Sequence, residues 1–251
     1  MWLFEKPIAH RGLHTDPKIL TENSMGAFKN AMEHGYNIET DVHLLKTGEV
    51  VVFHDDSLKR VVGKNVKISS LTLDDIKGDE YLLPNGEHIP LFTEMLELVD
   101  GKTGILLELK LNGFNYDLEK AVYELIKGKE SWIAVQAFNP YTVVWFAKNA
   151  PEFYRGLLSL SLLGCDVPLY NKRMKPHFIS FEIGGAKKQR KWTEKRGINL
   201  LVWTIRNNDK YNAALENRVN NIIFEKIDLD ELGFSMEKLE KPFDNLDKYS
   251  K

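Results

Sequence analysis

The chain has 251 residues, of which 43% are hydrophobic and 28% are charged, so we expect a globular protein rather than a disordered one. Its formal net charge of −2 argues against a nucleic-acid partner. No apolar run approaches the roughly 18 residues of a membrane span, and the first residues lack the features of a signal peptide. A single cysteine excludes an internal disulfide and suits a reducing compartment. We therefore expect a cytoplasmic protein without a stable membrane anchor, whose oligomeric state the sequence leaves open.

Short apolar runs alternate with helix-like segments along most of the chain. Several runs are unbroken, as is typical of parallel strands that are buried on both faces. The expected strands are Pro7–His10, Asn37–Val42, Val50–Phe53, Gly104–Lys110, Trp132–Ala137, Tyr154–Ser159, Phe178–Glu182, Leu200–Thr204 and Asn221–Phe224. The expected helices are Met25–His34, which Asn23 or Ser24 can cap, and Phe92–Val99, Tyr116–Ile126, Tyr141–Asn149, Ala186–Arg196 and Asn208–Glu216.

This alternation predicts an α/β protein of the (β/α)8 TIM-barrel class. If Val50–Phe53 is a hairpin partner or a continuation of the preceding strand, eight strands remain for the barrel. The polar segment from about residue 57 to 90 interrupts the alternation and contains the turn signal Pro84-Asn85-Gly86. We interpret it as a small insertion after the second strand, within a single domain that spans residues 1–251.

Charged and imidazole side chains stand at the ends of the expected strands, where the catalytic groups of such barrels lie. His10 and Arg11 end the first strand, and His54 follows Val50–Phe53. Glu39 and Asp41 are two residues apart on one strand, so their side chains share a face. Glu108 and Lys110 share a face of another apolar strand in the same way.

Three converging carboxylates need compensation, because two of them about 4 Å apart repel by roughly 4 kcal/mol at an effective dielectric constant of about 20. Oxygen ligands favour a hard divalent cation such as Mg²⁺ or Ca²⁺. Salt bridges to Arg11 and Lys110 without any metal remain the alternative. Two histidines beside a cation suit phosphodiester cleavage, since one can activate the nucleophile while the other protonates the leaving alkoxide.

At these residues the sequence resembles the glycerophosphodiester phosphodiesterases. The matching stretches extend to about residue 225. They are Ile8–Gly12 (IAHRG), Glu22–Phe28 (ENSMGAF), Ile38–Asp41 (IETD), Gly48–Asp56 (GEVVVFHDD), Leu58–Arg60 (LKR), Ile89–Leu91 (IPL), Leu107–Lys110 (LELK) and Val202–Ile205 (VWTI).

The resemblance implies a TIM barrel with a small insertion, which uses a divalent cation to hydrolyse glycerophosphodiesters to sn-glycerol 3-phosphate and an alcohol. It implies His10 and His54 as the acid/base pair, Glu39, Asp41 and Glu108 as metal ligands, and Arg11 and Lys110 as phosphate contacts.

The resemblance is less decisive at the remaining positions of the site. Trp203 would face the glycerol pocket, although a core position is nearly as compatible with the sequence, and Glu182 would either bind a glycerol hydroxyl or be purely structural. His14 is expected at the rim of the site or on the surface. Phe224-Glu225 departs from the Thr-Asp pair that is common in the family after the last strand, and Glu225 can substitute for that aspartate.

Two other functions stay open from the sequence. A lysophospholipase D or sphingomyelinase D-like activity would need an apolar groove, for which Phe114–Tyr116 or Leu157–Leu163 are candidates. A non-catalytic protein that binds phosphorylated ligands is the third possibility. In each case the expected partner is a small molecule.

Overall fold

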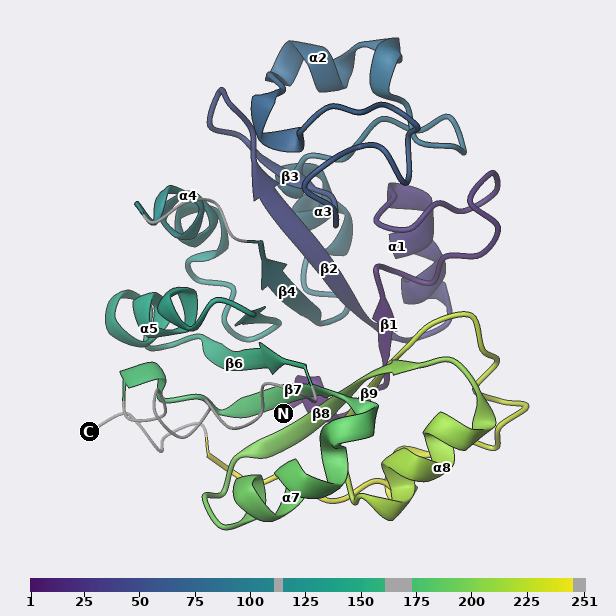
Figure 1. The fold of residues 1–251 in the computed structure, drawn as a ribbon, viewed down its shortest axis with the longest axis vertical. Helices are drawn as coiled ribbons and strands as arrows, with labels where there is room; N and C mark the ends of the chain where they lie inside the picture. The colour runs from purple at the N-terminus through teal and green to yellow at the C-terminus, as the bar shows by residue number, and fades with distance from the viewer. Residues whose placement is uncertain (111–114, 161–172, 246–251) are drawn as a thin grey trace.

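The computed structural model describes residues 1–110, 115–160 and 173–245. Within them, the strands form one sheet in the order β1-β9-β8-β7-β6-β5-β4-β2-β3, and pairing between β1 and β2 closes it into a barrel (Figure 1). The strands are β1 (Ile8–His10), β2 (Asn37–Leu44), β3 (Val50–Val52), β4 (Ile105–Leu109), β5 (Ile133–Ala137), β6 (Tyr154–Ser159), β7 (Phe178–Glu182), β8 (Asn199–Ile205) and β9 (Asn221–Phe224).

The strands of the closed ring pair in parallel, while β3 pairs with β2 in the antiparallel sense. The expected TIM barrel is therefore confirmed, and β3 is the hairpin partner of β2 rather than its continuation. The extra length of β2 at its end comes from this hairpin, in which Leu44 pairs with Val50.

Helices follow most of the strands and cover the outside of the barrel (Figure 1). In the described residues they are α1 (Met25–Glu33), α2 (Leu73–Lys77), α3 (Phe92–Val99), α4 (Asp117–Ile126), α5 (Pro140–Asn149), α7 (Ala186–Glu194) and α8 (Asn208–Glu216). Six of these were expected to within two residues at each end. The short helix α2 was not expected; Thr72 caps it and forms a reciprocal capping box with Asp75.

Apolar side chains fill both faces of the barrel wall. A large cluster lies between the strands and the surrounding helices, and a second cluster lies inside the barrel, where Leu3 and Phe4 pack against Ile8, Leu106 and other strand residues. This two-sided burial explains why the strand sequences are continuous apolar runs instead of alternating ones.

The segment between β3 and α3 packs around its own apolar cluster. Phe53, Leu58, Ile68 and Ile76 belong to that cluster. The segment, with α2, lies at the top of Figure 1, at the end of β2 and β3. The treatment of this segment as an insertion within one domain stays a prediction. Among the described residues, no helix combines the length and the apolar character that a membrane crossing requires.

Candidate active site

The register of the parallel strands brings the predicted site residues to the same end of the barrel. His10 is the pairing partner of Glu39, and Asp41 is the partner of Glu108. A cavity of about 170 Å³ lies at this end of the barrel. Seven of the nine predicted site residues line it, namely His10, Arg11, Glu39, His54, Glu108, Glu182 and Trp203. Asp41 and Lys110 adjoin it through their contacts with Glu108.

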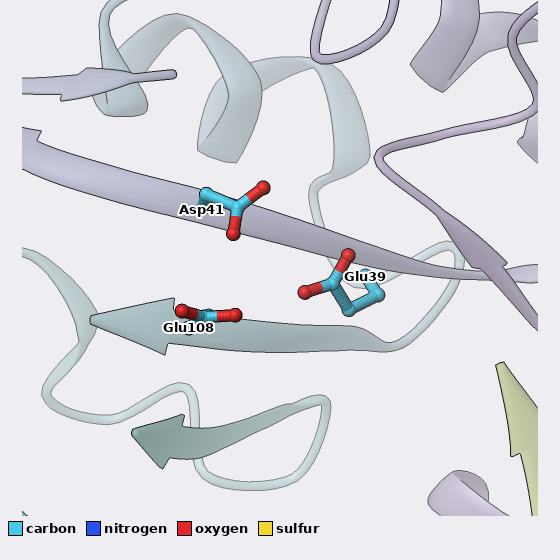
Figure 2. A group of neighbouring side chains, drawn as sticks. All are labelled: Glu39, Asp41 and Glu108. Carbon is cyan, nitrogen blue, oxygen red and sulfur yellow. The ribbon is translucent and has the colours of Figure 1, made fainter. Parts of the chain in front are cut away.

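The three predicted metal ligands form one group of carboxylates. Glu39 and Asp41 on β2 lie beside Glu108 on β4 (Figure 2), and one oxygen of each lies within 4.8 Å of the others. The backbone N–H of Arg11 donates to Glu39 Oε2 at 3.2 Å. Asn23, expected only as a helix cap, donates its side-chain amide to Asp41 Oδ2 at 2.9 Å.

The pKa values in this group differ because the neighbouring cations are shared unequally. Burial, together with the charges of Asp41 and Glu108, raises the pKa of Glu39 well above its usual value. Burial and the charge of Asp41 raise the pKa of Glu108 to about 7. Burial opposes ionisation of Asp41 too, but the charges of Lys110, His54 and Arg11 outweigh it and lower the pKa of that carboxyl. Burial and mutual repulsion therefore oppose full ionisation of the three carboxyl groups.

This donor set fits a divalent cation. The ligand atoms on offer are carboxylate oxygens from two adjacent strands, which hard ions such as Mg²⁺ and Ca²⁺ prefer. A cation among them would relieve the repulsion that raises the pKa values of Glu39 and Glu108.

The two predicted phosphate-contacting cations also contact these carboxylates. Lys110 Nζ lies 2.8 Å from Asp41 Oδ1 and 2.5 Å from Glu108 Oε1. Arg11 Nε lies 3.7 Å from Asp41 Oδ2. The salt bridges to Arg11 and Lys110 that we expected in a site without metal are thus present. They do not compensate Glu39, because its pKa is still raised.

A tight turn after β1 sets the position of Arg11. Arg11 and Gly12 have φ values of 58° and 76°, and a Cβ on Gly12 would lie 2.9 Å from backbone atoms of Ala27. Glycine is therefore needed at this position, where the turn passes close to helix α1.

A carboxylate at the end of β9 holds His10. The Nδ1 atom of His10 makes a short hydrogen bond with Glu225 Oε2, and Arg206 Nε donates to Glu225 Oε1 at 2.7 Å. Burial opposes ionisation of Glu225, but the hydrogen bond from His10 and the neighbouring His14 and Arg206 lower its pKa. His14 is only 7% exposed and lies 3.6 Å from Glu225, so of the two expected positions the surface one is wrong and the one next to the site remains.

His54 has a similar partner next to it in sequence. Its Nδ1 atom lies 2.5 Å from Asp55 Oδ1. Asp55 in turn accepts hydrogen bonds from Arg60, which also binds Glu22. Sequence reasoning assigned no role to Glu22 or Arg60, although both lie in motifs that it had identified. Desolvation lowers the pKa values of both His10 and His54 below the usual range.

Glu182 and Trp203 face each other across paired strands. Trp203 contacts the half-exposed Phe138 edge-to-face, with ring centroids 5.8 Å apart, and both rings line the cavity. Glu182 lines the cavity too, while its Oε2 accepts a hydrogen bond from the N–H of Gly184 at 3.1 Å.

Lys210, which no sequence pattern marked, is a further lining residue. Of the two segments proposed for an acyl groove, residues 114 and 161–163 lie outside the described residues.

Three carboxylates and two histidines thus lie together at the carboxyl-terminal end of a closed barrel. This arrangement is typical of a hydrolase that cleaves a phosphate ester with the help of a bound cation. The model of the glycerophosphoryl diester phosphodiesterase family matches residues 10–159. Relatives named glycerophosphodiester phosphodiesterase include one from Caldanaerobacter subterraneus, 30% identical over 233 residues, with 86% of this chain and 92% of that protein covered. A relative of the same name from Bacillus altitudinis is 30% identical over 169 residues, with 63% and 68% covered.

Solved structures agree with this relationship. The glycerophosphodiester phosphodiesterase from Thermotoga maritima is 26% identical and has a TM-score of 0.71, with 88% of this chain and 94% of that chain covered. A phosphodiesterase from Oleispira antarctica, solved with the product sn-glycerol 3-phosphate, is 23% identical, has a TM-score of 0.73 and covers 87% and 91%, and its likeness shows the fold. The chain belongs to the glycerophosphoryl diester phosphodiesterase family and is a phosphodiesterase.

Proposed function

We propose that this enzyme hydrolyses glycerophosphodiesters, such as glycerophosphocholine and glycerophosphoethanolamine, to sn-glycerol 3-phosphate and an alcohol. Such a reaction would recycle the head groups of deacylated lipids. The observation that carries the proposal is the placement of His10 and His54 on one cavity with the three clustered carboxylates. The product bound to the Oleispira antarctica relative adds support for the same chemistry.

Glu39, Asp41 and Glu108 are the proposed ligands of one divalent cation, Mg²⁺ or Ca²⁺. Bound there, the cation would supply Lewis-acid stabilisation of the charge on the phosphoryl oxygens. Arg11 and Lys110 are the proposed phosphate contacts, since both are cationic and both adjoin the carboxylates.

His10 and His54 are the proposed acid/base pair. One imidazole accepts the proton of the nucleophile, and the other donates a proton to the oxygen of the leaving alcohol. Each transfer contributes roughly 10²- to 10⁴-fold to the rate. Glu225 and Asp55 accept from Nδ1–H, which leaves Nε2 facing the reaction. The lowered pKa values favour the neutral ring in the histidine that acts as the base, whereas the histidine that acts as the acid reacts as the imidazolium ion, which its carboxylate partner stabilises.

Glu182 and Trp203 are proposed to bind the glycerol moiety. Both line the cavity next to the histidines, and they combine an apolar ring with a hydrogen-bond acceptor, which matches the two kinds of surface of glycerol.

The test is release of sn-glycerol 3-phosphate from glycerophosphocholine by the purified protein, with Mg²⁺ or Ca²⁺ added and with a chelator as control. We expect turnover that the chelator abolishes and the added ion restores. Turnover that survives full removal of divalent ions would refute the metal-dependent mechanism.

The same assay with lysophosphatidylcholine separates the lysophospholipase D alternative. We expect glycerophosphocholine to be the better substrate by kcat/KM. A preference for the lysophospholipid would move the assignment to that alternative. Binding of sn-glycerol 3-phosphate without turnover of either substrate would leave only the non-catalytic alternative.

A further inference from the structure

An arginine outside the cavity connects two of the side chains that line it. Arg60 lies in the segment that follows β3. Its Nε and Nη2 atoms donate to Asp55 at 2.7 and 3.0 Å, and Nη1 and Nη2 donate to Glu22 at 2.8 and 2.6 Å. The guanidinium group thus uses four of its five N–H donors on two carboxylates.

Each of these carboxylates makes a second contact, towards the cavity. Asp55 Oδ1 lies 2.5 Å from His54 Nδ1, and Glu22 Oε1 accepts from Arg11 Nη1 at 2.7 Å. We propose that Arg60 is a positioning residue, which holds the His54 imidazole through Asp55 and the Arg11 guanidinium through Glu22. The inference rests on the proposed function, because it concerns the orientation of groups assigned there to proton transfer and phosphate binding.

The geometry suits orientation better than overall stability. The side chain of Arg60 is 49% exposed, whereas those of Glu22 and Asp55 are 17% and 22% exposed. An ion pair with a half-exposed partner contributes little to the stability of the fold. A guanidinium that binds two carboxylates side-on nevertheless fixes both of their planes, which a lysine ammonium cannot do.

The chemistry of the bridge supports a role in catalysis. Partial burial favours the neutral acids, but hydrogen bonds from Arg60 lower the pKa values of Glu22 and Asp55 to about 2. An ionised Asp55 keeps the proton of His54 on Nδ1, so that Nε2 is free to exchange a proton with the substrate. Without Arg60, both carboxylates can rotate, and the two cavity groups lose their fixed orientation.

The test is steady-state hydrolysis of glycerophosphocholine by Arg60→Ala and Arg60→Lys, with Lys59→Ala as the matched control, because Lys59 is an exposed cation next to Arg60. Loss of partners that orient a reactive group costs about 10- to 100-fold, so we expect kcat/KM of Arg60→Ala to fall by that factor. We expect an intermediate loss for Arg60→Lys and a change within about twofold for Lys59→Ala.

A double-mutant cycle separates positioning from a purely structural role, because it measures whether the effect of Arg60→Ala on kcat/KM depends on Glu22 and Asp55. In a Glu22→Gln/Asp55→Asn background, we expect Arg60→Ala to change kcat/KM by less than about threefold, since the acceptor charges are already gone. We also expect added guanidinium ion to restore part of the activity of Arg60→Ala and none of the loss in Glu22→Gln/Asp55→Asn.

With a folded Arg60→Ala, either of two results would overturn the inference while leaving the proposed function intact. One is an active wild-type enzyme in which Arg60→Ala behaves like Lys59→Ala. The other is a loss in Arg60→Ala that is equally large in the double-variant background. If Arg60→Ala does not fold, wild-type kcat/KM in a folded Arg60→Lys overturns the inference as well. A wild-type protein without any turnover would instead count against the proposed function.

Discussion

Replacing Glu225 by glutamine tests how His10 is held in its reactive state. The glutamine keeps the size of the side chain and a hydrogen-bonding group beside His10 Nδ1, but it removes the negative charge. That charge is maintained in the folded protein, because hydrogen bonds from His10 and Arg206, with His14 nearby, keep the pKa of Glu225 low. The change therefore removes the stabilisation of the imidazolium ion that His10 becomes during proton transfer.

The size of the effect follows from the contact. A hydrogen bond to a charged group contributes about 1.5–3 kcal/mol, and about 1.4 kcal/mol corresponds to a tenfold change in rate. We therefore expect kcat for glycerophosphocholine to fall roughly 10- to 150-fold in Glu225→Gln. KM should change little, because Glu225 is not among the residues that line the cavity.

The assay is steady-state release of sn-glycerol 3-phosphate at saturating metal. Glu231→Gln is the control, since it makes the same substitution at an exposed position shortly after Glu225. Wild-type kcat in Glu225→Gln would refute the reasoning. So would a loss that disappears when the metal concentration is raised in a separate titration, because it would assign the effect to the cation site instead.

The remaining predictions concern packing, pH and proton transfer. Gly156→Ala should lower the free energy of unfolding in a denaturant titration by at least about 1–3 kcal/mol, because the added Cβ would lie 2.2 Å from the Phe178 ring. Gly78→Ala is the control and should change the free energy of unfolding far less, since the atom nearest to its added Cβ is 3.5 Å away. Glu22 has a pKa of about 2 instead of 4.5, so its ionised form stabilises the fold fully above about pH 4.5 and loses this effect as the pH falls through about 2. The difference in unfolding free energy between the wild type and Glu22→Gln should accordingly shrink on acidification, and a constant difference would contradict this. His54→Ala should lower kcat at least roughly a hundredfold with an unchanged circular dichroism spectrum; near-wild-type turnover would reject its acid/base role.

The barrel was predictable because its strands carry a strong local signal. A strand such as Ile105–Leu109 is buried along its whole length and apolar except at Glu108, and its boundaries follow from the turns around it. The helix Leu73–Lys77 carries a weak signal, since it has five residues in a polar segment and depends on the capping box of Thr72. The antiparallel pairing of Val50–Val52 could not be separated from a continuation of the preceding strand, because both fit the same apolar run.

The candidate site was predictable where residues stand at strand ends. The spacing of Glu39 and Asp41 places both on one face of a strand, and the barrel fold brings Glu108 next to them. The bridge from Arg60 to Glu22 joins residues 38 apart in sequence, and no periodicity marks such a contact. His14 illustrates the same limit, because its burial against Glu225 depends on the closure of the barrel between β1 and β9.

The most direct test of the whole account is a crystal structure of the protein soaked with Ca²⁺ and sn-glycerol 3-phosphate. We expect one ion coordinated by Glu39, Asp41 and Glu108, with the phosphate on that ion and between the imidazoles of His10 and His54. An ion bound away from these three carboxylates, or a phosphate out of reach of both histidines, would contradict the central claim.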